Sequence, residues 1–159
     1  MQGQAQVHVQ ASPERVYGIL SNVTRMGEWS PECYRCEWLD GATGPASGAR
    51  FKGYNRRGWL RWSTTCTVTD AEPGRAFAFE TSLPNFKRRG AQTRWRYEIE
   101  PVEGGVNLTE SFEWLWYFAV VVWLTFRGPR KRIAALEENM RQSLERIKAI
   151  AEGETKTGG

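Results

Sequence analysis

Apolar and polar positions divide the chain into a strand-rich body and one long C-terminal helix. Val7 and Val9 alternate with polar residues, which predicts a first strand. Residues 12–14, Ser-Pro-Glu, have the order of an N-cap followed by proline at the first helical position. They predict a short helix that ends near Leu20. Residues 21–32 are expected to form a second short helical or irregular piece.

Six further strands are predicted between residues 33 and 116. A glycine-rich loop over 40–48 follows the first of them, and a basic loop over 83–91 precedes the last two. The other connections are short turns of the hairpin type, so neighbouring strands should run antiparallel. The expected strands cover residues 33–39, 49–55, 59–70, 75–82, 92–100 and 106–116, with turns at 56–58, 72–74 and 103–105.

The helical pattern runs from Pro129 to about Ala151 and places one apolar stripe along a helix. An α+β fold buries such a stripe when a curved antiparallel sheet of about seven strands wraps around the helix. We expect one domain over residues 1–152, with two short helices after the first strand, and a disordered tail over 153–159. The stripe consists of Ile133, Leu136, Met140, Leu144, Ile147 and Ile150.

Tryptophan is unusually frequent, and most of its eight copies fall on predicted strands. Large aromatic rings bury much area at low entropic cost, and ligand pockets are built mainly from such side chains. This many rings on a curved sheet predict a lined cavity between the sheet and the helix. The tryptophans concerned are Trp38, Trp59, Trp62, Trp95, Trp114 and Trp116.

The charge of the chain is mildly positive, with a formal net charge of +4 over 159 residues. Its basic clusters, at 56–57, 87–89 and 127–132, fall at predicted turns or at the helix start. Solvated loop charge explains such clusters, so we expect no nucleic-acid partner.

Residues 1–10 lack the apolar core of a signal peptide. The longest apolar run, 114–126, is shorter than the ~20 residues that span a bilayer, and we expect a cytoplasmic protein.

The three cysteines suit a reducing compartment. Cys33 and Cys36 have C-x-x-C spacing, but they lie on a predicted strand, where residues three apart point to opposite faces. We therefore expect no disulfide between them, no metal site and no cofactor. His8 alternates with Val7 and Val9 and should face solvent, which disfavours Ser/His/Asp chemistry.

Several stretches of the chain resemble the SRPBCC superfamily (START/Bet v 1-like), and within it the bacterial polyketide cyclase/dehydrase-like family. The resemblance implies a helix-grip fold with a hydrophobic cavity. Members carry lipids, sterols, quinones or polyketides, and some cyclise or dehydrate polyketides, but no invariant catalytic set carries over to this chain. The stretches are ASPERVY at 11–17, GEWSPEC at 27–33, FKGYNRRG at 51–58, VTDAEPGRAFAFE at 68–80, WRYEIEP at 95–101 and GGVNLTESFE at 104–113.

Strand parity predicts which side chains face the helix and line the cavity. Glu110 stands out because it lies between Leu108 and Phe112 on the inward face. A buried carboxyl group has a raised pKa and is a candidate for acid/base work, while a satisfied structural network is the other interpretation and the one that such a residue more often represents. Glu32 is a weaker candidate. The predicted lining residues are Asn55, Trp62, Cys66, Phe79, Trp95, Tyr97, Glu110, Phe112 and Met140.

Three functions fit these features. The leading hypothesis is the binding or carriage of a hydrophobic, lipid-like or polyketide-like molecule. The first alternative is a polyketide cyclase or dehydratase that uses Glu110, helped by Asn55 or Tyr97, to move protons. The second is an interaction or membrane-peripheral module that uses residues 114–126 beside the basic cluster at 127–132. Both a monomer and a homodimer remain open.

Overall fold

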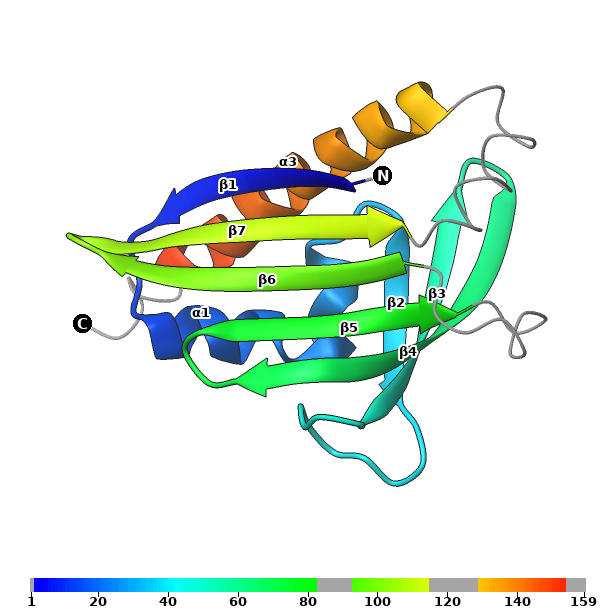
Figure 1. Cartoon of the computed structure of the whole chain (residues 1–159), viewed down its shortest axis with the longest axis horizontal. Helices are drawn as coiled ribbons and strands as arrows, with labels where there is room; N and C mark the ends of the chain where they lie inside the picture. Colours follow the sequence, from blue (N-terminus) through cyan, green and yellow to red (C-terminus); the bar gives the residue numbers. More distant parts are fainter. Residues whose placement is uncertain (1, 83–92, 115–128, 154–159) are drawn as a thin grey trace.

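One curved antiparallel sheet forms the body of the protein and packs against a long helix (Figure 1). The computed structural model describes residues 2–82, 93–114 and 129–153. Among these residues the seven strands lie in the order β1-β7-β6-β5-β4-β3-β2. The strands are β1 (Gln2–Val9), β2 (Cys33–Trp38), β3 (Arg50–Arg57), β4 (Leu60–Glu72), β5 (Ala76–Ser82), β6 (Thr93–Val102) and β7 (Gly105–Trp114).

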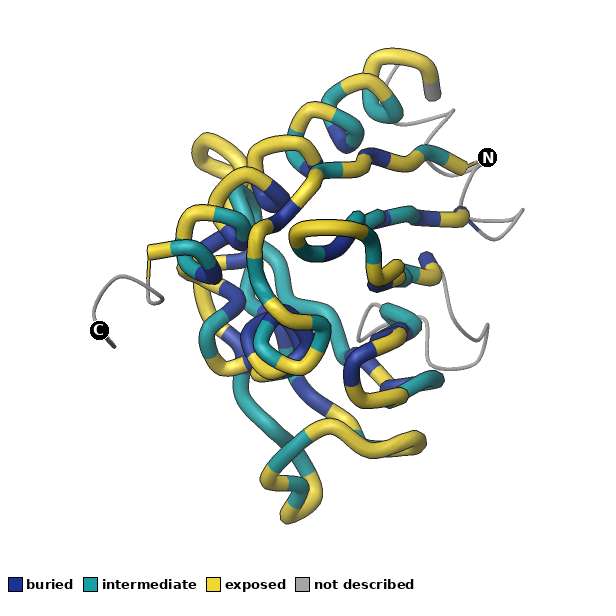
Figure 2. Tube along the Cα trace, turned by 90° about the vertical axis from the view of Figure 1, so that its left-hand side faces the viewer, coloured by how far each residue is buried: buried dark blue, intermediate teal, exposed yellow. Residues whose placement is uncertain are grey.

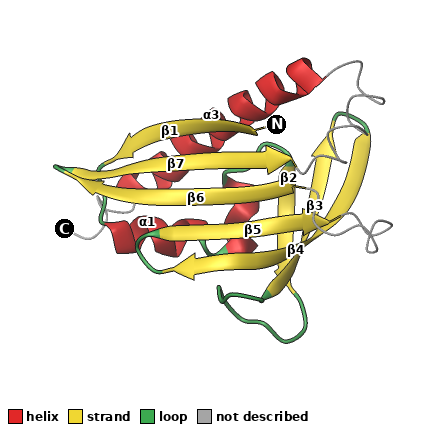
Figure 3. Ribbon diagram, in the orientation of Figure 1, coloured by secondary structure: helices red, strands yellow, loops and turns green. Residues whose placement is uncertain are grey.

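The helices lie on one side of this sheet, as Figure 3 shows. They are α1 (Pro13–Leu20), the 3-10 helix η1 (Val23–Glu28) and α3 (Pro129–Gly153). The Ser12 hydroxyl accepts a hydrogen bond from the Arg15 backbone N–H at 3.2 Å, so the predicted N-cap is confirmed. The long helix was predicted over 129–151 and ends two residues later, at Gly153.

The core lies between the concave face of the sheet and α3. Along β7 every second residue is buried, as a strand with one wet face requires. Figure 2 shows the buried residues gathered inside the molecule and the exposed ones around its outside. The apolar stripe of α3 faces the same core, with Leu136, Met140, Leu144 and Ile147 buried and Ile133 and Ile150 partly buried. The helix-grip arrangement predicted from the sequence is therefore confirmed.

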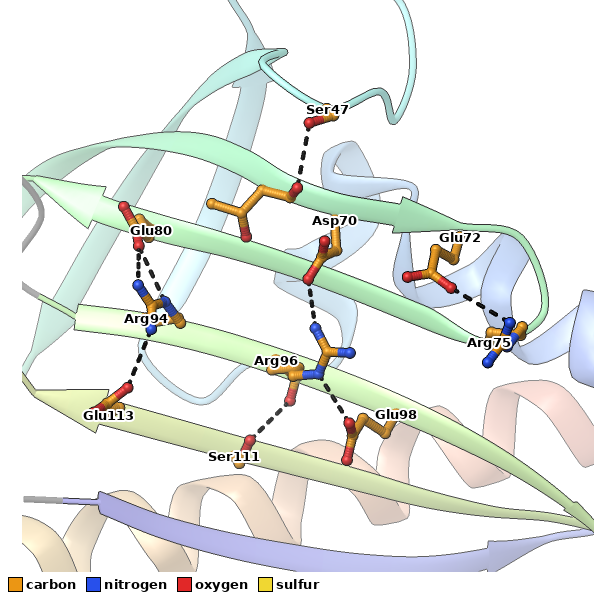
Figure 4. Close-up of polar contacts among 11 residues, drawn as sticks. Ser47, Asp70, Glu72, Arg75, Glu80, Arg94, Arg96, Glu98, Ser111 and Glu113 are labelled. Atoms are coloured by element: carbon orange, nitrogen blue, oxygen red, sulfur yellow. Dashed lines mark hydrogen bonds and ion pairs between the residues drawn. The ribbon is translucent and has the colours of Figure 1, made fainter.

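The outer face of the sheet is polar. Arg94 on β6 forms ion pairs with Glu80 on β5 at 2.7 Å and with Glu113 on β7 at 3.3 Å. Arg96 pairs with Asp70 on β4 and with Glu98 on its own strand (Figure 4). These charges cover the convex side with solvated groups, which leaves the concave side as the place for an apolar ligand.

The turn between β3 and β4 differs from the prediction. It was expected at 56–58, but the last ladder pair joins Arg57 to Leu60, so the turn consists of Gly58 and Trp59. Gly58 has a φ of +59°, a conformation that glycine adopts without strain. Trp59 was expected on a strand among the cavity-lining tryptophans. It is instead 92% exposed, because the turn carries it beyond the end of the sheet.

The prediction for the first two cysteines is also corrected. The pairing of β2 with β3 shifts between Cys33 and Arg35, which resets the alternation of faces along β2. Cys33 and Cys36 therefore lie on the same face, and their Sγ atoms are 3.3 Å apart. The expectation that strand geometry turns the two side chains apart was wrong, although the cysteines are free thiols in the structure.

All three thiols should be slow to react in the native protein. Cys33, Cys36 and Cys66 are each less than about a tenth exposed. We expect an aromatic disulfide reagent to titrate three thiols in the unfolded, unreduced chain and to react far more slowly before unfolding. Fewer than three thiols after unfolding would show that the Cys33–Cys36 pair is oxidised.

Three sequence predictions lie outside the described residues. They are the basic loop at 83–91, the interaction segment at 114–126 apart from Trp114, and the tail at 153–159 apart from Gly153. Trp116, which was expected among the cavity tryptophans, and the start of the basic cluster at 127–132 also lie outside the described residues.

Candidate functional site

A cavity of about 460 Å³ lies between α3 and the concave face of the sheet. Its wall is mainly apolar and aromatic, and it includes two clusters of polar side chains besides single polar residues such as Asn55 and Thr64. One is Glu110 with Tyr97, and the other is a cluster of Glu32, Arg132 and Asn139. Pockets of about 300–1,000 Å³ with apolar walls and a few polar groups are typical of small-molecule sites.

The predicted lining residues, with one exception, border this cavity. The exception is Phe112, which is 2% exposed but does not reach the cavity. Its ring packs against Trp95 and Trp114, with ring centroids 5.5 Å away in both cases. Phe112 faces inward as predicted, but it belongs to the packed core beside the cavity. The alternation along a strand predicts which side chains face the helix. It does not predict how far the helix lies from each of them, and this distance decides whether a side chain borders the cavity or packs in the core.

Glu110 and Tyr97 are direct cross-strand partners on β7 and β6. Both are 4% exposed, and the Tyr97 hydroxyl donates a hydrogen bond to Glu110 Oε1 at 2.9 Å. Glu110 Oε2 is buried and has no hydrogen-bond partner among the described residues. The polar group expected near Glu110 is therefore Tyr97, and a carboxyl oxygen of Glu110 is left free at the cavity wall.

Burial raises the pKa of Glu110 to about 8, and the hydrogen bond from Tyr97 offsets only part of this effect. Glu110 is consequently mostly protonated at pH 7. Burial, and then the neighbouring Glu110, also raise the pKa of Tyr97 well above its usual value. The buried indole N–H of Trp29 lies near the Tyr97 hydroxyl without reaching hydrogen-bond geometry. The site thus offers a protonated carboxyl group and a phenol, both uncharged.

The second polar cluster joins the start of α3 to the segment before β2. Two guanidinium nitrogens of Arg132 donate to the two carboxylate oxygens of Glu32 at 2.6 and 2.8 Å. Asn139 Nδ2 also donates to Glu32, at 3.0 Å. The side chains of Arg132 and Glu32 are only 15% and 17% exposed. Sequence reasoning missed this bidentate pair, since only Glu32 was noted and its partner lies 100 residues away.

Asn55 and Trp62 take part in the cavity wall without contacting Glu110. Asn55 is half-buried, and its Nδ2 lies 3.5 Å from the Thr64 hydroxyl. Trp62 is the residue opposite Asn55 on β4 and is also half-buried. Among the described residues no hydrogen bond joins Asn55 to Glu110, whose partner is Tyr97. The Asn55 side chain still borders the cavity and could contact a ligand there.

A metal site, a histidine-based catalytic site and a membrane-spanning helix each have requirements with which the described residues can be compared. These ranges contain no group of three His, Cys, Asp or Glu side chains suited to a metal ion. His8 is exposed on β1, as predicted, and does not border the cavity. None of the helices in residues 2–82, 93–114 and 129–153 has the length and apolar character needed to cross a membrane.

Comparison with protein families matches residues 2–152 to a family described as "Polyketide cyclase / dehydrase and lipid transport". No curated protein matches the sequence. A Polyketide_cyc-like protein from Corynebacterium glutamicum has a similar structure, with 29% identity and a TM-score of 0.64 over 99% of this chain and 94% of that chain.

Two aromatase/cyclases share the fold at lower identity. The Zhui aromatase/cyclase of a Streptomyces species is 16% identical, with a TM-score of 0.75 over 100% of this chain and 98% of that chain. The di-domain StfQ from the steffimycin biosynthetic pathway is 17% identical, with a TM-score of 0.76 over 98% of this chain and 51% of that chain. At these identities the likeness concerns the fold alone.

Proposed function

Because this chain belongs to the polyketide cyclase/dehydrase and lipid transport family, we propose that it binds and carries a hydrophobic small molecule between α3 and the sheet. One observation carries the proposal. An apolar cavity of about 460 Å³ includes a carboxyl group that is buried, neutral and free on one oxygen. Such a group can donate a hydrogen bond to a ligand carbonyl or hydroxyl oxygen.

The charges around the cavity favour a neutral ligand. The described lining contains two cationic side chains, Arg57 and Arg132, and Arg132 is already paired with Glu32. No described cation contacts Glu110, whose hydrogen-bond partner is Tyr97. An anionic head group placed beside Glu110 would lose its hydration without gaining a counter-charge. An apolar body with one or two carbonyl or hydroxyl oxygens, as in a sterol, a quinone or a cyclised polyketide, fits better.

A pair of tryptophan substitutions on β4 tests the location of binding. Thr64 borders the cavity, whereas Thr67 is exposed on the same strand. We expect Thr64→Trp to displace ligand by filling the cavity and Thr67→Trp to bind like the wild type. Native mass spectrometry of the purified proteins would report co-purified ligand, and fluorescence of added aminoanthracene would report vacant cavity. Equal behaviour of the two variants would rule out this cavity as the binding site.

A second function, acid–base catalysis on a poly-ketone, is favoured by the contact of a neutral carboxyl group with a phenol. In that case Glu110 would protonate a carbonyl oxygen as a new carbon–carbon bond forms, and would recover its proton from the substrate in a later step. Tyr97 would hold the carboxyl group in place through its hydrogen bond to Oε1.

The Glu110→Gln variant separates carriage from catalysis. Glutamine keeps the shape of the side chain, an acceptor for the Tyr97 hydroxyl and a hydrogen-bond donor for a ligand, but it cannot exchange a proton. A carrier should therefore keep its affinity to within a few-fold. An enzyme should keep its affinity and lose turnover by about 100-fold or more, as is usual when a general acid is removed.

A further inference from the structure

The tip of the β3–β4 hairpin, residues 56–61, has an unusual surface. Trp59 is 92% exposed and Leu60 is 41% exposed. In the described part of the chain only Tyr34 joins them as an exposed large hydrophobic side chain. Trp59 occupies the apex because it follows Gly58 in the two-residue turn. An indole held almost fully in water at the end of a hairpin indicates a contact outside the chain.

The same tip carries three exposed arginines, Arg56, Arg57 and Arg61. No carboxylate of the described residues forms an ion pair with them; Arg56 lies over the Tyr34 ring at 5.4 Å. Two acidic side chains, Glu32 and Glu138, border the adjoining groove. They are held by Arg132 and Arg141 respectively. The positive charge of the tip is therefore available to an external anion.

The tip also lies at the cavity. Arg57 and Leu60 belong to the cavity wall, and the adjoining groove is shared by the tip and α3. In Figure 1 the β3–β4 turn and the start of α3 occupy the same end of the molecule. The first turn of α3 adds two exposed cations, Arg130 and Lys131, for which the described residues offer no ion pair. Apolar and basic groups thus surround one end of the cavity.

We propose that the hairpin tip docks this protein on an anionic membrane surface, with Trp59 and Leu60 in the interfacial region and the arginines among the lipid head groups. Tryptophan suits that depth, and basic side chains near it attract anionic lipid. A protein partner fits less well, because a stable interface covers about 800 Å² on each side. Here a convex turn presents two apolar side chains.

The docking places one end of the cavity at the membrane, so that an apolar ligand can move between the two without crossing water. This consequence rests on the proposed function, whereas the docking itself does not. This docking uses the hairpin tip at residues 56–61 and not the segment 114–126, and all residues of the tip are described in the structure.

Flotation of the full chain with phosphatidylcholine vesicles, with and without phosphatidylglycerol, tests the docking. We expect the wild type to float only with the anionic vesicles, and less at high salt. Changing Arg56, Arg57 and Arg61 to glutamine should weaken partitioning by on the order of 100-fold. Changing Trp59 and Leu60 to serine should weaken it at least about tenfold, while Trp59→Phe should keep most of it.

A charge-matched control removes three arginines elsewhere. Changing Arg50, Arg75 and Arg94 to glutamine gives the same net charge but leaves the tip and the adjoining groove intact, and each of these arginines forms an exposed ion pair. We expect this control to float almost like the wild type. The proposal is overturned if the wild type stays unbound with anionic vesicles, or if the tip variant and the control lose binding equally.

Aminoanthracene binding without vesicles separates this proposal from the proposed function. It is measured on Trp59→Ser and on the double variant Arg56→Gln with Arg61→Gln, because none of these three residues borders the cavity. Normal probe binding by these variants, together with weaker flotation than that of the wild type, supports docking as a separate step. Flotation by a wild type that binds no probe would retain the docking and reject the cavity as a ligand site.

Discussion

Relative to the wild type, Glu110→Gln should gain about 1.4 kcal/mol of unfolding free energy for each pH unit between about pH 5 and 7.5. The reason is the pKa of Glu110, which burial raises from 4.5 to about 8 in the folded protein. In this range the unfolded wild type releases the proton while the folded wild type keeps it. Rising pH therefore favours unfolding of the wild type. The variant has no such group, so the difference grows by about 3 kcal/mol across the range.

Urea unfolding of both proteins at several pH values would measure this difference. Replacing the carboxyl group with an amide adds an offset that does not depend on pH, so the slope of the difference curve is the diagnostic quantity. Glu113→Gln is the matched control because Glu113 lies on the same strand and is exposed, with Arg94 as its partner. We expect its difference curve to be flat above about pH 5. A flat curve for Glu110→Gln would mean that the carboxyl group is already ionised in the folded protein.

Arg132→Met should lower the free energy of unfolding by about 3 kcal/mol. The substitution leaves the Glu32 carboxylate mostly buried, with Asn139 as its remaining partner in the cluster. Removing one member of a buried ion pair is costly because the other charge stays dehydrated. For a chain of this length the loss corresponds to a melting temperature roughly 6–12 °C lower, which thermal unfolding monitored by circular dichroism would detect.

Arg141→Met provides the comparison on the same helix. Arg141 pairs with Glu138 at 3.3 Å, but these side chains are 62% and 57% exposed, and exposed pairs contribute about 0–1 kcal/mol. The double variant Glu32→Gln with Arg132→Met should be more stable than Arg132→Met alone, since no charge is then left unpaired. If Arg132→Met and Arg141→Met were equally mild, the Glu32–Arg132 pair would contribute little to holding α3 in place.

The architecture was predictable because its signals are local and periodic. The alternation around Leu108 and Glu110 gives the buried face of β7, and the stripe from Leu136 to Ile147 gives the buried face of α3. The same alternation placed Glu110 inside and indicated a raised pKa. The hydrogen-bond partner of Glu110 was harder to predict. The strand register that places Tyr97 opposite Glu110 depends on the turn between β6 and β7.

The errors arose where a periodic rule fails locally or where distant segments meet. A shift of one residue in β2 brought Cys33 and Cys36 to one face. A two-residue turn moved Trp59 from an expected strand into solvent. The Glu32–Arg132 pair depends on the docking of α3 against the segment before β2, which no local pattern reports.

The pairing of β1 with β7 has a consequence for the order of folding. Val9 lies opposite Val106 and Gln2 opposite Glu113, so this ladder closes a loop of about a hundred residues. Contacts so distant along the chain carry a large entropic cost before they contribute stability, and they slow folding. During synthesis β1 leaves the ribosome long before its sheet neighbour β7 exists. Strand β1 therefore cannot pair with β7 until most of the chain has been translated, and α3, which packs against β1, is synthesised last.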